Sequence, residues 1–415
     1  MHLFTSRFLE RPEHVSELPG SVTTPKGFVA AGVAAGLKKS GKPDLGILLA
    51  RDNCISATLF TSNAAAAAPV RFCQEETGKG AIKGVVVNSG SANACTGGQG
   101  MLDAREMARL AEEFTGIETG RMAVASTGAI GSLLPMDIVR TGVIDASRSL
   151  SEIGGSLFAE AIRTTDTIEK QGAVGVGLSG GPVNIGICAK GAGMIAPNMA
   201  TLLVFVTTDV QAPADMLHEL LSVAVTRSFN SISVDGDMST NDSIFLLASG
   251  SSGVSIEKGG KDEEIFQEAL AALCRSMALK MVADGEGATK TVELKVAGAA
   301  SATEAAHVAE AVSHSSLVRT AFFGRDANWG RIMAAAGAAL AGGPPLEADV
   351  YYEDICLARL GAAVVSGVDA GELEKIMIQP EISVTLDLHR GAASYTMYFS
   401  DLTHDYVSLN SEYTT

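Results

Sequence analysis

Apolar and polar residues recur along the chain with two different periods. Ile382–Leu388 alternates apolar and polar side chains at every second position, which predicts a strand with one buried and one solvated face. Other short apolar runs, bounded by glycine and turn residues, are typical of strands as well. Strands are predicted at Gly84–Asn88, Val183–Ala189, Thr201–Thr208, Thr291–Val296, Ile382–Leu388 and Ser394–Ser400. His389–Gly391 is predicted to be the loop of a hairpin that joins the last two strands.

Longer segments carry apolar residues at helical spacing instead. Helices are predicted at Met101–Phe114, Ser151–Ile162, Glu263–Met281, Ala302–Val312 and Ala370–Met377, and after Pro213. Strands and helices mix without a regular strand–helix–strand rhythm, so the pattern favours an α/β fold of the α+β kind, built as layers, over a doubly wound sheet. Gly250–Asp262 and Asp284–Lys290 are candidate joints between parts of the fold.

Composition narrows the class of protein. The 415 residues include 31 basic and 47 acidic side chains, which gives a net charge of −16 and argues against binding nucleic acid or an anionic membrane surface. No apolar run reaches the roughly 18 residues of a membrane span, and Met1–Pro19 lack the apolar stretch of a secretory signal. The six cysteines form no C-x-x-C pair and the histidines no H-E-x-x-H, so no metal site is predicted. With no span or signal predicted, a cytoplasmic protein is favoured, in which structural disulfides are not expected.

Two short motifs are excluded as ligand sites. Gly175–Gly180 matches G-x-G-x-x-G, but a strand-like run follows it where a dinucleotide site needs a helix, so a turn between strands is predicted. Asp235–Asp242 resembles a calcium loop but has Thr240 where glycine is required and Leu246 where an acid is required. Its acidic residues are instead candidates for a buried polar network.

Thr201 is a candidate nucleophile. It follows a glycine-rich segment and the small residue Ala200, and it opens an apolar run. An isolated threonine there is usually only a strand former. However, a hydroxyl beside a strained peptide bond can attack it and cut the chain. The freed α-amino group, with an ordinary pKa of about 7.7–8.0, would then act as the base for the same residue's hydroxyl.

Several long blocks carry a family resemblance. KGAGMIAPNMATLLVFVTTD, from Lys190 to Asp209, closely resembles the self-cleaving segment of the glutamate N-acetyltransferase (ornithine acetyltransferase) family of arginine biosynthesis. Other blocks follow in the family's order across Pro25–Thr415: PKGFVAAGVAAGLKKSGKPDL, VVVNSGSANACTG, ASTGAIG, TTDT, FNSISVDGDMSTND, DGEGATK, FGRDANWGRIMAAAG and LNSEYTT. The sequence is therefore identified as a member of this family.

The resemblance implies a fold and an assembly. It implies a layered sandwich similar to N-terminal-nucleophile enzymes in residues 1–285, and a smaller C-terminal α/β domain in residues 286–415 whose tail returns to the site. It also implies cleavage between Ala200 and Thr201, which would give an α chain (1–200) and a β chain (201–415) within an α2β2 heterotetramer.

The resemblance also implies a role for each site residue. Thr201 is the implied nucleophile, and Thr127 and Gly128 form the oxyanion hole. The implied substrate-binding residues are Thr164, Lys190, Thr201, Glu286, Asn410 and Thr415. A lysine suits substrates that carry a carboxylate, and Glu286 suits the cationic amine of ornithine. Arg163 stands where an apolar residue is usual, and its charge is a candidate influence on substrate preference.

The implied activity is a ping-pong transfer of acetyl from N2-acetylornithine through Thr201 to glutamate, without a cofactor. Acetyl-CoA is a further candidate donor, because some members of the family accept it. Three alternatives stay open from sequence: an N-terminal-threonine amidohydrolase, an ornithine acetyltransferase of secondary metabolism, and a non-catalytic amino-acid sensor.

Overall fold

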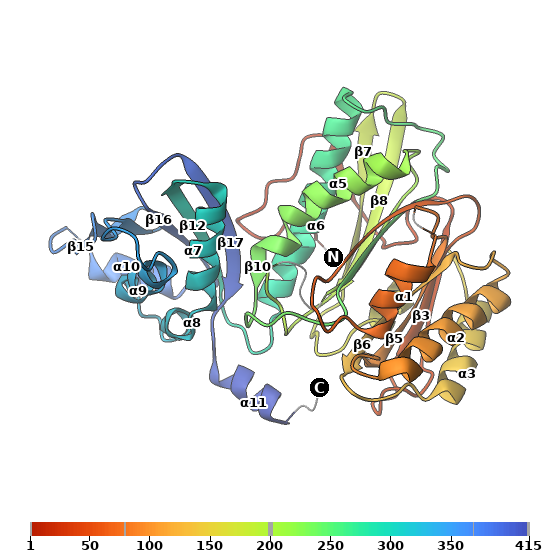
Figure 1. Ribbon diagram of the computed structural model, residues 1–415. Coiled ribbons are helices and arrows are strands. Elements are labelled where there is room, and N and C mark those ends of the chain that lie inside the picture. Colours follow the sequence, from red (N-terminus) through yellow and green to blue (C-terminus); the bar gives the residue numbers. More distant parts are fainter. Residues whose placement is uncertain (1, 79, 198–201, 368, 413–415) are drawn as a thin grey trace.

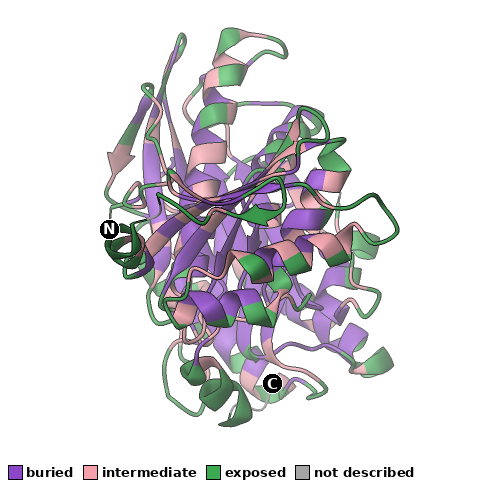
Figure 2. Cartoon of the chain, turned by 90° about the vertical axis from the view of Figure 1, so that its left-hand side faces the viewer, coloured by how far each residue is buried: buried purple, intermediate pink, exposed green. Residues whose placement is uncertain are grey.

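The computed structural model describes residues 2–78, 80–197, 202–367 and 369–412 (Figure 1). Most of the chain before Ala283 builds two β-sheets stacked between layers of helices. The C-terminal part forms a third sheet with its own helices. The predicted layered α/β sandwich with a smaller C-terminal α/β part is confirmed. Buried residues fill the strands, whereas exposed residues gather on turns and outer helix faces (Figure 2).

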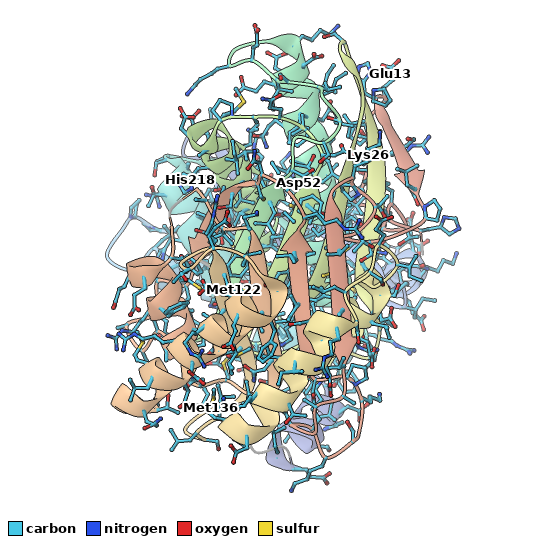
Figure 3. The ribbon with its side chains drawn as sticks, turned by 90° about the vertical axis from the view of Figure 1, so that its right-hand side faces the viewer. Glu13, Lys26, Asp52, Met122, Met136 and His218 are labelled. Atoms are coloured by element: carbon cyan, nitrogen blue, oxygen red, sulfur yellow. The ribbon has the colours of Figure 1, made fainter. Side chains whose placement is uncertain are left out.

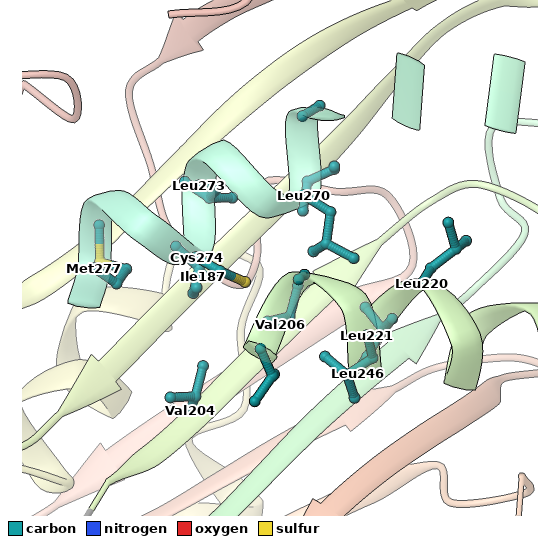
Figure 4. Close-up of a cluster of buried hydrophobic side chains, with 14 of the residues drawn as sticks. Ile187, Val204, Val206, Leu220, Leu221, Leu246, Leu270, Leu273, Cys274 and Met277 are labelled. Atoms are coloured by element: carbon teal, nitrogen blue, oxygen red, sulfur yellow. The ribbon is translucent and has the colours of Figure 1, made fainter. Parts of the chain in front are cut away.

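The six-stranded sheet has the order β1-β7-β8-β9-β11-β4. Its strands are β1 (Val15–Leu18), β4 (Ile55–Phe60), β7 (Lys170–Leu178), β8 (Gly181–Lys190), β9 (Leu203–Thr208) and β11 (Ser243–Ala248). Alternate side chains of β9 pack into two different hydrophobic cores, because successive side chains of a strand point to opposite faces of the sheet. Val204 and Val206 pack with helices α5 (Ala214–Thr226) and α6 (Lys261–Ala283), as Figure 4 shows. Leu203 and Phe205 belong to the core on the other face, toward the second sheet.

The four-stranded sheet has the order β2-β3-β5-β6. Its strands are β2 (Phe28–Val33), β3 (Leu45–Ala50), β5 (Gly84–Ser91) and β6 (Met122–Ala129), and helices α1 (Ala68–Glu76), α2 (Gly97–Thr115), α3 (Met136–Arg148) and α4 (Gly155–Ala161) contact it. Figure 3 labels Met122 and Met136 at the starts of β6 and α3. β5 and β6 run parallel, so both end at the same edge of the sheet.

The C-terminal sheet has the order β10-β17-β12-β16-β13-β14-β15. Its strands are β10 (Ile232–Ser233), β12 (Thr291–Ala299), β13 (Asp349–Tyr352), β14 (Ile355–Arg359), β15 (Ala362–Ala363), β16 (Glu381–Asp387) and β17 (Ala393–Ser400). Helices α7 (Ala302–His314), α8 (Ser316–Phe323), α9 (Trp329–Ala339), α10 (Ala370–Met377) and α11 (His404–Glu412) follow or separate these strands. β10 comes from the sandwich part of the chain, and it pairs with β17.

The predicted hairpin at His389–Gly391 is wrong. β12 lies between β16 and β17, pairing parallel with the first and antiparallel with the second. The connection from β16 to β17 therefore crosses the end of β12. The apolar side chains of β12 are buried in the middle of the sheet, and the local pattern of two later segments cannot reveal that a third strand separates them.

Most other predicted elements exist with shifted ends. The turn expected at Gly175–Gly180 is confined to Ser179 and Gly180, because residues up to Leu178 continue β7. β9 begins at Leu203, and Thr201, where its start was predicted, lies outside the described residues. The predicted joint at Asp284–Lys290 connects α6 to β12. Among the helices of the described ranges, none is both long and apolar enough to cross a membrane.

Candidate active site

A pocket of about 300 Å³ opens between the sandwich and the C-terminal tail. The ends of β6 and β8, the 235–241 loop and α11 contribute to its wall. A volume near the lower end of the usual ligand range suits a molecule of amino-acid size. The lining residues include Thr127, Gly128, Thr164, Lys190, Glu286 and Asn410.

Six residues predicted from sequence thus meet in one place, although they come from distant segments. Ala200, Thr201 and Thr415 lie outside the described residues. The flanking strands are described: Lys190, the last residue of β8, pairs with Leu203, the first residue of β9.

Thr127 and Gly128 lie at the end of β6, where it approaches β5 closely. Gly128 has φ +132°, and a Cβ there would lie 2.4 Å from the carbonyl carbon of Gly90, so glycine is required. The Thr127 hydroxyl lies 3.4 Å from the Lys190 ammonium. Because an ammonium only donates, the hydroxyl accepts this hydrogen bond and its own proton stays free for another acceptor. A hydroxyl that keeps a free proton at the wall of the pocket can donate to a developing oxyanion.

Lys190 is a buried cation at the wall of the pocket, with 2% of its surface exposed. Burial lowers its pKa below the ordinary lysine value, and the negative charge of Asp166 offsets part of that shift. A buried ammonium that lines a small pocket suits a ligand carboxylate.

Glu286 supplies the opposite charge. Its backbone N–H donates to the Ala192 carbonyl at 2.7 Å, and its carboxylate accepts from the Asn410 side chain at 2.9 Å. The tail helix α11 therefore reaches the pocket through a contact with Glu286. A cation and a carboxylate in one small pocket complement a zwitterionic ligand.

Gly193 allows Glu286 to approach the 191–193 segment. A Cβ at Gly193 would lie 2.6 Å from the Glu286 carboxylate, closer than real contacts allow. We expect Gly193→Ala to displace Glu286 and weaken ornithine binding about tenfold, the effect of one lost charge-assisted contact. Calorimetric titration with ornithine measures this. Gly337→Ala on α9, where the added Cβ meets nothing within 4 Å, is the matched control. If Gly193→Ala bound ornithine with the same affinity as wild type, that result would contradict the placement of Glu286 in the ornithine site.

Sequence reasoning left two pocket residues without a role. Asp235 accepts from the backbone N–H groups of Met194 and Ile195, and from the Tyr406 hydroxyl at 3.3 Å. Burial raises the pKa of Asp235. The expectation of a buried polar network held by the acidic residues of this loop included Asp235, but nothing local indicated Tyr406, which lies 171 residues away.

Asp242 ends the same loop and is fully buried. Its Oδ1 accepts from the Leu202 N–H at 2.7 Å, whereas Oδ2 has no hydrogen-bond partner within the described part of the chain. Burial raises its pKa well above the usual range. The Asp242 carboxyl group therefore lies against the amide that follows Thr201 in the sequence.

Arg163 does not line the pocket. Its guanidinium pairs with Glu160 and donates to the Asp166 carbonyl at 2.8 Å. The charge that the sequence places beside Thr164 is therefore largely neutralised locally. Within the described ranges, no group of three or more His, Cys, Asp or Glu side chains could hold a metal ion.

The fold and the site together define a class: a layered α/β protein with a small polar pocket, lined by the buried cation Lys190 and the half-buried carboxylate Glu286. Comparison with known families identifies the member of that class. The ArgJ family model matches residues 29–415, and the chain belongs to this family.

Named relatives agree over nearly the full length. The chain is 47% identical over 401 residues to the arginine biosynthesis bifunctional protein ArgJ of Symbiobacterium thermophilum, covering 96% of this chain and 99% of that protein. It is 43% identical over 393 residues to the ArgJ protein of Geobacter sulfurreducens, covering 94% and 99%. The resemblance seen in the sequence is confirmed, and with it the assignment to the acetyltransferase enzymes of arginine biosynthesis.

A solved structure is also similar. The ornithine acetyltransferase of Mycobacterium tuberculosis, complexed with ornithine, is 40% identical with a TM-score of 0.41. The match covers 44% of this chain and 98% of that one.

Proposed function

We propose that the protein transfers the acetyl group of N2-acetyl-L-ornithine to L-glutamate through an ester on Thr201. The observation that carries this proposal is the meeting of Lys190, Glu286, Thr127 and Gly128 in one pocket of amino-acid size. Lys190 binds the carboxylate that both substrates share, and Glu286 binds the side-chain ammonium of ornithine.

The enzyme first cuts its own chain. The Thr201 hydroxyl attacks the Ala200 carbonyl, an ester replaces the amide, and water hydrolyses the ester. Ala200 then ends the α chain (1–200), and the β chain (201–415) begins with a free amine. The two chains stay together, and two copies of each form an α2β2 heterotetramer in the cytoplasm.

Transfer then proceeds in two half-reactions. The Thr201 amine takes the hydroxyl proton while the oxygen attacks the acetyl carbonyl, and Thr127 Oγ1 and the Gly128 N–H stabilise the oxyanion. The carbon–nitrogen bond breaks, and ornithine leaves with the proton. The amino group of glutamate next attacks the acetyl ester and restores the hydroxyl.

In this proposal the 1–285 domain carries the nucleophile and the 286–415 domain completes the pocket with Glu286, Asn410 and Thr415. Acetyl-CoA acts as a second donor to the same threonine. No cofactor is required, because the ester itself carries the acetyl group.

Glutamate dependence tests the proposed transfer. We expect ornithine release from N2-acetylornithine to accelerate on adding glutamate, with equimolar N-acetylglutamate formed and parallel lines in double-reciprocal plots. Chromatography of both products over time measures this. Release of ornithine and free acetate at a rate independent of glutamate would instead identify an amidohydrolase, in which water reaches the acyl-enzyme.

A further inference from the structure

Behind the pocket lies a chain of three buried charged groups that do not line it. The Lys170 ammonium lies 2.7 Å from Asp166 Oδ1 and 2.5 Å from Asp284 Oδ2. The side chains of Lys170 and Asp166 are 0% exposed, and that of Asp284 is 5% exposed. Removing such charges from water costs about as much as their attraction returns, so a buried ion pair is weak support for a purely stabilising role.

Asp166 joins this group to two pocket residues. Its Oδ1 also accepts from the Gly191 N–H at 2.8 Å, and its Oδ2 accepts from the Thr164 N–H at 3.2 Å. Gly191 directly follows Lys190. One carboxylate therefore fixes the backbone at Thr164 and beside Lys190. The ammonium groups of Lys170 and Lys190 outweigh burial and lower the pKa of Asp166, so it stays ionised.

Asp284 joins the group to the third pocket residue. It accepts from the backbone N–H and the hydroxyl of Thr167, in the loop that holds Thr164. Glu286 lies two residues further along the chain and donates its N–H to Ala192. The 191–193 segment is thus held on one side by Asp166 and on the other by Glu286.

We propose that Asp166, Lys170 and Asp284 are positioning residues that hold Thr164, Lys190 and Glu286 in their substrate-binding arrangement. The inference rests on the proposed function, because it assigns those three residues to the substrate. The buried group contacts no substrate itself. It works by fixing two loops and the end of β8 against one another. Productive binding tolerates only small displacements, so loosening this frame weakens substrate binding.

Asp166→Asn is the sharpest variant. An amide offers one acceptor oxygen, so its NH2 group must face either the Thr164 N–H or the donors Gly191 and Lys170. We expect the KM for N2-acetylornithine and the Kd for ornithine to rise roughly tenfold, with a smaller change in kcat. Lys170→Met/Asp284→Asn, which removes one charge of each sign, should act in the same direction.

The controls separate positioning from stability. Lys258→Met/Glu219→Gln removes an exposed ion pair of 2.7 Å that lines no part of the pocket, and both constants should stay at wild-type values. Thr167 is exposed, so Thr167→Val is expected to fold even where the buried variants do not. It removes one hydrogen bond to Asp284 and should raise both constants roughly threefold.

Circular dichroism and melting curves accompany each kinetic measurement. Raised KM and Kd in folded protein support the proposal. Unchanged KM and Kd with a lowered melting temperature overturn it, because the group then only stabilises the fold. Where a buried variant does not fold, the KM, the Kd and the melting temperature of Thr167→Val decide in the same way whether the proposal stands. A wild-type enzyme that neither binds ornithine nor releases it from N2-acetylornithine would instead refute the proposed function, and that failure is separate.

Discussion

Replacing Thr201 with alanine is expected to leave one uncut chain and to abolish acetyl transfer. Without the hydroxyl, nothing attacks the Ala200 carbonyl, so the free amine never forms and no acetyl ester can be made. Loss of a nucleophile costs at least about 10³-fold in kcat, and here the loss of the base adds to it. Denaturing electrophoresis together with the ornithine-release assay measures both effects.

Thr201→Ser is the matched control for this prediction. Serine keeps a hydroxyl and, after cleavage, an amine, so the variant should still cut itself and retain measurable transfer. If Thr201→Ala were cut into two fragments, or if Thr201→Ala transferred acetyl at a rate near that of wild type, another group would perform the chemistry.

Replacing Lys190 with methionine is expected to raise the KM for glutamate by roughly 10–100-fold at neutral pH. The expected loss is that of a charge-assisted hydrogen bond to the substrate carboxylate. Lys190 is also buried, so in Lys190→Met water has little access to solvate the substrate carboxylate in place of the ammonium. Steady-state kinetics at fixed N2-acetylornithine measures the change.

The pH dependence tests the same residue independently. Burial lowers the pKa of Lys190, so its charge is present below that depressed value and is lost as pH rises through it, earlier than for an exposed lysine. The wild-type KM for glutamate should therefore rise on the alkaline side. Lys190→Arg keeps its charge at every accessible pH and should flatten this rise. A KM that is independent of pH in wild type, or unaffected in Lys190→Met, would remove Lys190 from the carboxylate site.

The sequence allowed the candidate residues to be predicted where they stand in distinctive blocks. Lys190 precedes a glycine-rich turn, and Glu286 and Asn410 lie in blocks matched by resemblance. The structure brings these three to one pocket, while their roles stay predictions. The Asp166–Lys170–Asp284 group could not be predicted in this way, because Lys170 and Asp284 are 114 residues apart and no local period links them.

The same limit explains the error in the C-terminal sheet. Ile382–Leu388 alternates apolar and polar residues and Ser394–Ser400 is a short, largely apolar run, and the structure confirms both strands as β16 and β17. Which strands become neighbours depends on the burial of β12 between them, which is a property of the whole sheet. The local pattern therefore predicted the two strands correctly and their pairing wrongly.

The most direct test of the account is the mass of the denatured protein after brief exposure to N2-acetylornithine without glutamate. We predict two fragments that meet at Ala200 and Thr201, with the mass of one acetyl group added to the β chain and removed again when glutamate is supplied. A single uncut chain, or a β chain that never gains this mass while ornithine is released, would contradict the acetyl-threonine mechanism.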